Sequence, residues 1–344
     1  MPAHVVAGLR RAMELGLAAA GSTSPNPPVG AVLLDTAGYI VGEGATQPVG
    51  GAHAEVMAVR AAGSAARGST AVVTLEPCNH TGRTGPCSTM LIEAGVAEVY
   101  FLHSDPNPVA AGGSATLRAA GVEVHHIEIP TDDFRRSLPA DALVPWLTAT
   151  KLNRPHITLK FGQTLDGFSA AVDGSSKWIT GPVARQFAHA DRARRDAIVV
   201  GTGTALSDNP SLTARDPHGE LYPHQPRRVV IGKRPIANAP VASNLNALGF
   251  EQFDSIDCAL QALYEQGVRS ILVEGGPGLA SAFLAAELVD AIHAYIAPAL
   301  LGHGRSILAH PLADTIANAH RFERTGLVEL GDDVLITYAR PRAS

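Results

Sequence analysis

The sequence predicts two α/β domains in tandem. Its 344 residues are too many for one ordinary domain and suggest about two, each able to bury a core. Helix and strand patterns alternate through residues 1–130, and β-branched apolar runs flanked by glycine recur from residue 156 onward. A stretch of mixed charge that contains several prolines, residues 130–155, connects the two halves. We therefore expect one domain at 1–148 and a second at 149–344.

The N-terminal half has the pattern of a small sheet covered by helices. Residues 3–20 place apolar side chains at helical spacing and lack the continuous apolar segment and cleavage site of a signal peptide. The crossovers that follow are long enough for parallel strand pairing. The expected strands are 29–35, 69–77, 97–105 and 122–129, and the expected later helices are 53–63, 87–95 and 112–121.

The C-terminal half has the pattern of buried strands in an α/β sheet. Most of its strand segments are apolar and β-branched, as expected where both faces of a sheet are covered. Residues 215–226 combine glycine, prolines and charges, so we expect them to form an exposed loop. The strand-bearing segments are 156–167, 196–206, 227–232, 270–284, 291–302 and 334–340.

Composition and charge narrow the classes of function. The chain is 46% hydrophobic and 17% charged, and it has no run of about 18 apolar residues that could span a bilayer, so we expect no membrane partner. Its formal net charge is −5, and no dense Lys/Arg cluster is present, which argues against nucleic acid as a partner. Three cysteines cannot form a disulfide scaffold and indicate a reducing, cytoplasmic compartment.

Four residues could build a catalytic zinc site. His53 and Glu55 open an expected helix, Cys78 follows an expected strand, and Cys87 opens the next helix. One imidazole and two thiolates supply three protein ligands and leave a fourth position for water. Glu55 could then reach that water without being a ligand, and the helix dipole favours a thiolate at position 87.

Other interpretations of the same residues are open. A His-x-Glu pair alone is more often a solvated helix start, and two distant cysteines alone are more often unrelated core thiols. His80 could replace water as a fourth ligand, which would make the zinc structural. The position of His80 in a polar loop suits substrate contact better.

The combined motifs resemble a known family. Zinc nucleotide deaminases pair His-x-Glu with two cysteines, usually as Pro-Cys-x-x-Cys, whereas this chain has eight residues between Cys78 and Cys87. The longer form LEPCNHTGRTGPC, together with HAEV and PNPPVGAV, resembles the deaminase domain of the bifunctional riboflavin-biosynthesis deaminase/reductase family. This resemblance implies a cytidine-deaminase-like three-layer α/β/α fold.

The resemblance also implies roles for individual residues of the N-terminal half. Zn²⁺ would be held by three side chains, Glu55 would shuttle the proton, and a further group would contact a pyrimidine ribosyl phosphate. The implied zinc ligands are His53, Cys78 and Cys87, and the implied substrate contacts are Asn26, His80 and Arg83. Arginine suits a phosphate because its planar guanidinium can donate two parallel hydrogen bonds.

Two positions depart from the family pattern. Family members typically have a histidine seven residues before the zinc histidine, and this chain has Thr46 there. They often have another histidine two residues after the glutamate, where this chain has Met57. Thr46 places one expected substrate contact in question but leaves the metal chemistry unchanged.

The C-terminal half resembles the family's second domain, a reductase with a dihydrofolate-reductase-like α/β fold that uses NADPH. The matching segments are LKFGQTLDG, SSKWITG, DNPSLTAR and VEGGPGLASAFL, in the family's order. From the residues alone, ILVEGGPGLASAF is a strand, a glycine turn and a helix start, which can present backbone N–H groups to a phosphate. No segment here completes G-x-G-x-x-G, so the residues alone do not indicate a Rossmann domain.

Two residue sets follow from this second resemblance. Taken alone, Trp178 would be a core or interdomain aromatic residue, and Arg192 would be part of a solvated helix face. Asp208 and Glu274 are only candidates for a general acid. Those implied to lie along NADPH are Gly162, Trp178, Thr204, Asp208, Gly276, Pro277, Gly278, Leu279, Ala280, Ser281 and Ala282. Those implied to face the substrate are Ser176, Arg192, Leu212, Arg215 and Glu274.

The resemblance covers nearly the whole chain and predicts a bifunctional enzyme of riboflavin biosynthesis. The first domain would deaminate 2,5-diamino-6-(5-phosphoribosylamino)pyrimidin-4-one, and the second would reduce the ribosyl side chain with NADPH to give 5-amino-6-(5-phosphoribitylamino)uracil. The partner is thus a small phosphorylated pyrimidine, and a homodimer is expected from the family. Two alternatives are a nucleic-acid-editing deaminase with an added domain, and a structural zinc protein whose second domain binds a regulatory nucleotide.

Overall fold

The structure is a computed structural model that describes residues 1–80 and 85–341. The chain divides into two compact units, Met1–Asn153 and Arg154–Ser344. The domain boundary expected after residue 148 falls inside a helix, α6 (Leu143–Leu152), that belongs to the first unit. In the part of the chain that is described, no helix is both long and apolar enough to cross a membrane.

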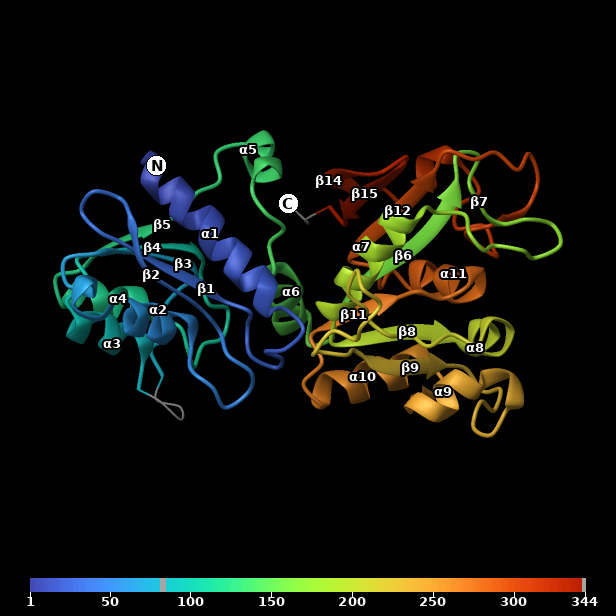
Figure 1. Ribbon diagram of the computed structural model, residues 1–344, viewed down its shortest axis with the longest axis horizontal. Helices are drawn as coiled ribbons and strands as arrows, with labels where there is room; N and C mark the ends of the chain where they lie inside the picture. Colours follow the sequence, from blue (N-terminus) through green and yellow to red (C-terminus); the bar gives the residue numbers. More distant parts are fainter. Residues whose placement is uncertain (81–84, 342–344) are drawn as a thin grey trace. The chain divides into compact units, whose positions relative to one another are not determined.

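The first unit is a five-stranded sheet between two helical layers. Its strand order is β2-β1-β3-β4-β5. Figure 1 shows α2, α3 and α4 gathered together beside this sheet. The helices are α1 (Ala3–Ala19), α2 (Ala54–Ala62), α3 (Cys87–Ala94), α4 (Gly113–Ala119), α5 (Asp132–Ser137) and α6, and the strands are β1 (Gly30–Leu34), β2 (Ile40–Ala45), β3 (Thr70–Leu75), β4 (Glu98–His103) and β5 (Glu123–His126).

The pairing of this sheet is mixed. β3, β4 and β5 are parallel, as the long crossovers between them allow, whereas β1 runs antiparallel to both β2 and β3. The strand β2 was not expected, because IVGEGA is rich in glycine and only partly buried. Its glycines let α2 approach closely, since a Cβ at Gly44 would lie 2.5 Å from the Ala54 carbonyl oxygen.

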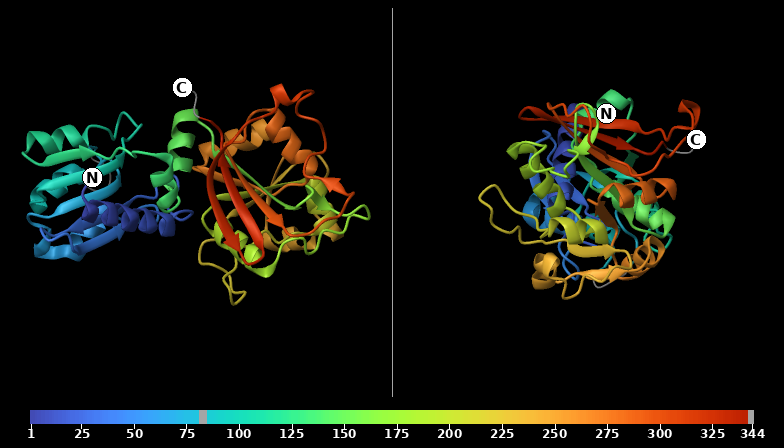
Figure 2. Two further views of the ribbon diagram at one scale, coloured as in Figure 1. Left: turned by 90° about the horizontal axis from the view of Figure 1, so that it is seen from above. Right: turned by 90° about the vertical axis from the view of Figure 1, so that its right-hand side faces the viewer.

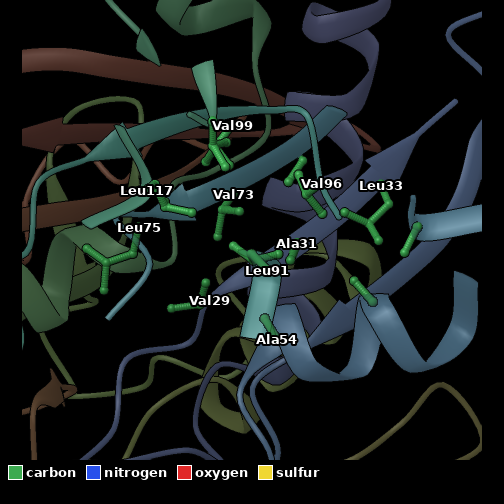
Figure 3. Packing of buried hydrophobic residues seen from close by; sticks show 14 of the residues in the cluster. Val29, Ala31, Leu33, Ala54, Val73, Leu75, Leu91, Val96, Val99 and Leu117 are labelled. Atoms are coloured by element: carbon green, nitrogen blue, oxygen red, sulfur yellow. The ribbon is translucent and has the colours of Figure 1, made fainter. Parts of the chain in front are cut away.

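Two apolar clusters on opposite faces of the sheet make the core of the first unit. On one face, Val73 of β3 and Leu91 of α3 are fully buried, and Figure 3 shows them lying together. On the other face, Val5 and Leu9 of α1 pack against Val72. Alternate residues of β3 therefore serve the two layers, which is the pattern of a strand covered on both sides.

The second unit is built on an eight-stranded sheet with the order β10-β9-β8-β11-β6-β12-β15-β14. The views in Figure 2 show the twist of this sheet. The strands are β6 (His156–Thr164), β7 (Phe168–Ala170), β8 (Ala197–Gly201), β9 (Arg227–Ile231), β10 (Glu251–Phe253), β11 (Ser270–Val273), β12 (Ala291–Ala297), β13 (Arg305–Ser306), β14 (Glu323–Leu330) and β15 (Asp333–Ala339), and the helices are α7 (Pro182–Ala193), α8 (Thr202–Asp208), α9 (Ser243–Leu248), α10 (Ile256–Glu265) and α11 (Pro277–Ala285).

The parallel part of this sheet decides where a ligand can bind. The six strands from β10 to β12 are parallel, while β15 and β14 add an antiparallel hairpin. Helices α10 and α11 pack on one face, and α8 and α9 pack on the other. Because all six parallel strands end at the same edge, the loops after β6, β8, β9 and β11 lie there, where ligands bind in open α/β sheets.

Candidate active sites

The predicted zinc ligands come together in the first unit. The Nδ1 atom of His53 lies 3.3 Å from Sγ of Cys87 and 3.6 Å from Sγ of Cys78. One ligand atom from each of the three residues falls within 4.8 Å of the other two. One imidazole and two thiols at this spacing fit a tetrahedral zinc ion that keeps one position free for water.

The local fold explains why these three side chains converge. His53 is the N-cap of α2, Cys87 is the first residue of α3, and Cys78 follows the end of β3. The backbone N–H of Cys87 points to Sγ of Cys78 at 3.5 Å. A helix N-terminus favours negative charge, so both helix starts turn their positive ends toward the cluster.

The electrostatics of the cluster favour one thiolate in the metal-free protein. The Cys87 thiol donates a hydrogen bond to Cys78, and this bond lowers the pKa of Cys78. The same hydrogen bond, followed by burial, raises the pKa of Cys87. The hydrogen bond to Cys78 raises the pKa of His53. Cysteine binds metals as the thiolate, so a lowered thiol pKa prepares the site for a cation.

Glu55 lies beside the cluster but is not part of it. Its side chain is buried in the first turn of α2, and burial, followed by the nearby charge of Cys78, raises the pKa of Glu55 to about 7. A carboxyl group whose pKa lies near neutrality can both accept and donate a proton at physiological pH. This geometry suits the predicted proton shuttle.

The segment after Cys78 is held by neighbouring loops. Asn79 accepts hydrogen bonds from the hydroxyls of Ser88 and Thr116, and its N–H donates to the Ala110 carbonyl. Gly113 allows a very close approach, because a Cβ there would lie 1.7 Å from the carbonyl oxygen of Pro77. The strand end that carries Cys78 is therefore fixed from two sides.

The other predicted residues of this unit differ in their exposure and in their hydrogen bonds. Asn26 lies in a turn in which its N–H donates to the Thr23 carbonyl, and its side chain is half-buried. His80 is half-buried, and its Nδ1 is buried without a hydrogen-bond partner among residues 1–80 and 85–341. Arg83 lies outside the described residues. Met57 is half-buried on α2, next to β2.

Thr46 has a structural role. Its side chain is buried, its hydroxyl accepts a hydrogen bond from the Val29 N–H at 3.1 Å, and its own N–H donates to the Val29 carbonyl at 2.9 Å. This pairing extends the contact between β1 and β2 by one residue. The position that departs from the family pattern therefore joins the sheet where β1 begins and β2 ends.

In the second unit, two glycine turns meet at the carboxyl ends of parallel strands. Gly276 is the N-cap of α11, and its N–H donates to the hydroxyl of Thr204 at 2.9 Å. A Cβ at Gly276 would lie 3.1 Å from that hydroxyl, whereas one at Gly278 would meet nothing within 4 Å. The turns after β8 and β11 thus form a cradle of small residues that fits a dinucleotide phosphate.

The other residues predicted to lie along NADPH vary in exposure. Ala280 is buried in the core, and the buried hydroxyl of Ser281 accepts hydrogen bonds from the N–H groups of Ala309 and His310. Trp178 is 70% exposed, with the Arg185 guanidinium 4.3 Å from its ring centre. Gly278, Ala282 and Asp208 are exposed, Pro277 and Leu279 are half-buried, and Gly162 faces Tyr295 across β6 and β12.

Arg192 and Glu274, both predicted substrate contacts, bind one another. The Nε and Nη2 atoms of Arg192 donate to the two carboxylate oxygens of Glu274 at 2.7 and 2.8 Å. Lys160 lies 3.7 Å from the same carboxylate. Burial alone would raise the pKa of Glu274, but the charges of Arg192 and Lys160 outweigh it and hold that pKa at about 2. The carboxylate is therefore ionised and unsuited to act as a general acid.

The remaining predicted substrate contacts lie apart from this pair. Leu212 is buried in the core beside α8 and α9, with a positive φ of 50°. Arg215 is exposed, and its guanidinium donates to the carbonyl of Gly219. Ser176 is exposed, and its carbonyl accepts the N–H of Ile179.

A second buried network was not predicted. Asp191 accepts hydrogen bonds from Arg195 at 2.7 Å and lies 3.0 Å from Nδ1 of His293. Arg195 also donates to the hydroxyl of Thr158. The hydroxyl of Tyr295 is buried with no hydrogen-bond partner among the described residues. No pattern in the sequence indicated this network, because its members come from α7, the turn after it, β6 and β12, which are far apart in the chain.

Each of the two units matches a known protein family. A model described as "RibD C-terminal domain" matches residues 155–336. A second model, "Cytidine and deoxycytidylate deaminase zinc-binding region", matches residues 7–103. The first match covers more than half of the chain. The second includes the cluster of His53, Cys78 and Cys87, and the first includes the glycine turns after β8 and β11.

Similar proteins cover nearly the full length. The chain is 61% identical to the riboflavin biosynthesis protein RibD of Corynebacterium ammoniagenes, over 90% of this chain and 91% of that protein. It is 44% identical to RibD of Mycobacterium tuberculosis, over 95% of this chain and 94% of that protein. The solved structure of Acinetobacter baumannii RibD, form 1, is 35% identical and matches 98% of this chain and 99% of its own with a TM-score of 0.81.

Proposed function

The chain belongs to the RibD family of riboflavin biosynthesis proteins, and we propose that it carries out a deamination followed by a reduction. A solved structure from Thermotoga maritima, with 31% sequence identity and a TM-score of 0.84 over 98% of this chain and 99% of that one, is that of a diaminohydroxyphosphoribosylaminopyrimidine deaminase/5-amino-6-(5-phosphoribosylamino)uracil reductase. The first unit deaminates 2,5-diamino-6-(5-phosphoribosylamino)pyrimidin-4-one with zinc. The second reduces the product with NADPH to 5-amino-6-(5-phosphoribitylamino)uracil. One observation carries the deaminase assignment, the convergence of His53, Cys78 and Cys87 beside the buried Glu55.

In the deaminase step, we assign the metal to His53, Cys78 and Cys87. Zinc, when bound, supplies an activated water near neutral pH. Glu55 would take one proton from the attacking water and give it to the ring nitrogen, and would then take the second proton from the added hydroxyl and give it to the amino group, which leaves as ammonia. Its raised pKa supports this exchange, because a carboxyl group that titrates near pH 7 can act as base and then as acid. We assign substrate contacts to Asn26, His80 and Arg83.

In the reductase step, the chain mainly orients its ligands. NADPH, when bound, supplies the hydride, and the protein provides alignment and charge. We assign the glycine turns after β8 and β11 to the cofactor, because their small residues and the start of α11 suit a phosphate. The pair of Arg192 and Glu274 borders the substrate, with Glu274 accepting hydrogen bonds from sugar hydroxyls. Ser176, Leu212 and Arg215 remain predicted contacts.

Two further properties are part of the proposal. A homodimer is supported by β14, the terminal strand of the sheet, which exposes 53% of Leu327 and 37% of Val328. A reducing, cytoplasmic compartment is supported by thiols at Cys78 and Cys87 that suit a metal better than a disulfide. Light scattering after size exclusion tests the first, and cell fractionation tests the second.

The variant Glu55→Gln tests the proposed function. It keeps the size of the side chain and the three zinc ligands but removes the proton carrier. We expect full zinc content, loss of ammonia release by about 100-fold or more, and unchanged reduction of substrate that has already been deaminated. Unchanged ammonia release would show that the cluster is structural. Loss of reduction as well would show that the variant is misfolded.

A further inference from the structure

The buried carboxylate of Asp191 joins the end of α7 to the sheet of the second unit. One of its oxygens accepts hydrogen bonds from Nε and Nη2 of Arg195, at 3.0 and 2.7 Å. The other oxygen lies 3.0 Å from Nδ1 of His293 on β12. The carboxylate therefore contacts both the turn that follows the helix and a strand beneath it.

Arg195 extends this contact to two more strands. Its Nη1 donates to the hydroxyl of Thr158 on β6 at 2.9 Å and lies 3.4 Å from the hydroxyl of Ser270 on β11. The strands β11, β6 and β12 are neighbours in the sheet. Two buried charged side chains, Asp191 and Arg195, thus fix the end of α7 to three adjacent strands.

The residue next to Asp191 is Arg192, which binds Glu274. Consecutive helix residues point about 100° apart, so Asp191 can face the sheet while Arg192 reaches the carboxylate that follows β11. His293 leads to the same carboxylate, because it lies opposite Lys160 in the register of β12 and β6, and Nζ of Lys160 lies 3.7 Å from Glu274. The network around Asp191 therefore borders the ion pair that we place beside the substrate.

The energetics of this network favour a role in geometry over a role in stability. Burying charged groups costs solvation, which offsets much of their mutual attraction. Their hydrogen bonds are directional, so together they define one position for the end of the helix. A displacement of about 1 Å in a group that binds substrate can lower a reaction rate by about 100-fold. A fixed end of α7 therefore benefits the site that Arg192 helps to form.

We propose that Asp191 is a positioning residue of the reductase. By binding Arg195 and His293 together, it sets where Arg192 meets Glu274 and so sets the geometry of the substrate site. The inference rests on the proposed reductase function, in which Arg192 and Glu274 border the substrate. Without this anchor, Arg192 would shift and the deaminated substrate would bind more weakly. The glycine turns assigned to NADPH would keep their positions, because they lie in other loops.

The test compares the full-length wild type with Asp191→Asn, which keeps the shape of the side chain and removes its charge. The matched control is Asp290→Asn. It makes the same change in another buried pair of the same unit, in which Nη1 and Nη2 of Arg154 donate to Asp290 at 2.7 and 2.8 Å. Asp290 directly precedes β12, so it lies at the end of that strand away from the ligand-binding edge. Urea unfolding, kcat and KM for previously deaminated substrate, and KM for NADPH are measured for each protein, at a temperature at which all are folded.

We expect both variants to lose stability in urea. Only Asp191→Asn should raise KM for the deaminated substrate, by about 10-fold, while its KM for NADPH stays within about twofold. An unchanged substrate KM in Asp191→Asn, or an equal rise in Asp290→Asn, would overturn the proposal.

A second pair of variants decides the matter if Asp191→Asn does not fold. His293→Gln keeps a hydrogen-bond donor for Asp191, whereas His293→Leu does not. Only the Leu variant should raise the substrate KM, and equal values for the two would overturn the proposal. If the wild type did not reduce the substrate at all, the proposed reductase function would fail. Calorimetric titration of the same variants with deaminated substrate would then still decide the role of Asp191.

Discussion

Arg192 and Glu274 form a two-point ion pair in which both nitrogen-to-oxygen distances are below 2.9 Å and both side chains are largely buried. Arg192 comes from α7, and Glu274 directly follows β11, so the pair joins the helix to the sheet at the ligand-binding edge. A buried pair of this kind contributes less to stability than its distances suggest, but removing one partner leaves an uncompensated charge. The pair therefore holds the predicted substrate side of the reductase in one geometry.

The variant Glu274→Gln should damage the second unit alone. It leaves the Arg192 charge without its counterion, so we expect the free energy of unfolding of this unit to fall by about 3 kcal/mol and the reduction to be strongly impaired. Ammonia release should be unchanged. The matched variant Glu251→Gln breaks the more exposed pair with Arg227 and should cost less than about 1 kcal/mol. Equal losses in urea denaturation would contradict this account of the buried pair.

Thr46→Val should destabilise the first unit without removing its metal. The exchange keeps the shape of the side chain but removes a buried hydroxyl that accepts from the Val29 N–H, which also donates to the Pro27 carbonyl at 3.0 Å. We expect the free energy of unfolding to fall by about 1 kcal/mol, while zinc content is retained. Thr46→Ser keeps the hydroxyl and serves as the control. If Val and Ser behave alike in thermal unfolding, the hydroxyl has no structural role.

The stability of the second unit should depend on pH through His156. Burial lowers the pKa of this histidine to about 4, against an ordinary value of 6.5. The unfolded state therefore binds a proton that the folded state refuses, and stability falls as the pH drops from 6.5 toward 4, by about 3 kcal/mol in total. His156→Val should flatten this part of the profile relative to the wild type. Parallel profiles in urea titrations would show that His156 does not cause the loss.

Removing the metal should separate the two activities. With Cys78→Ser, one ligand of the cluster is lost, so we expect zinc content and ammonia release to fall together while reduction of deaminated substrate persists. Treatment of the wild type with a chelator should have the same effect. Cys258→Ser is the control, because Cys258 is exposed and lies in the other unit. A loss of reduction in chelator, reversed by zinc, would contradict the assignment of zinc to the first unit alone.

The sequence predicted the metal cluster well, because its residues stand at helix starts and strand ends that can be recognised locally. His53, Cys78 and Cys87 were identified because each occurs at a helix start or strand end, and the structure brings them together. The strand β2 was missed because its glycines, needed for contact with α2, lower its strand propensity. The antiparallel pairing of β1 with β3 could not be predicted, since crossover length permits parallel pairing but does not require it.

The ligand contacts implied by the family resemblance said less about what surrounds each residue. Leu212 and Ser281 were both predicted as ligand contacts, yet Leu212 packs in the core and the Ser281 hydroxyl holds the loop at Ala309. Their contact with ligands stays a prediction. The network around Asp191 could not be predicted, because it depends on which side chains of β6, β12 and α7 face one another, and only the three-dimensional packing decides that.

The most direct test of the account is the order of the two reactions on one substrate. The diaminopyrimidine ribosyl phosphate is supplied to the zinc-loaded enzyme with and without NADPH, and ammonia and NADPH are both followed. The account predicts ammonia release without NADPH, and NADPH oxidation that begins only after ammonia appears. NADPH oxidation that precedes ammonia, or ammonia release that requires NADPH, would contradict it.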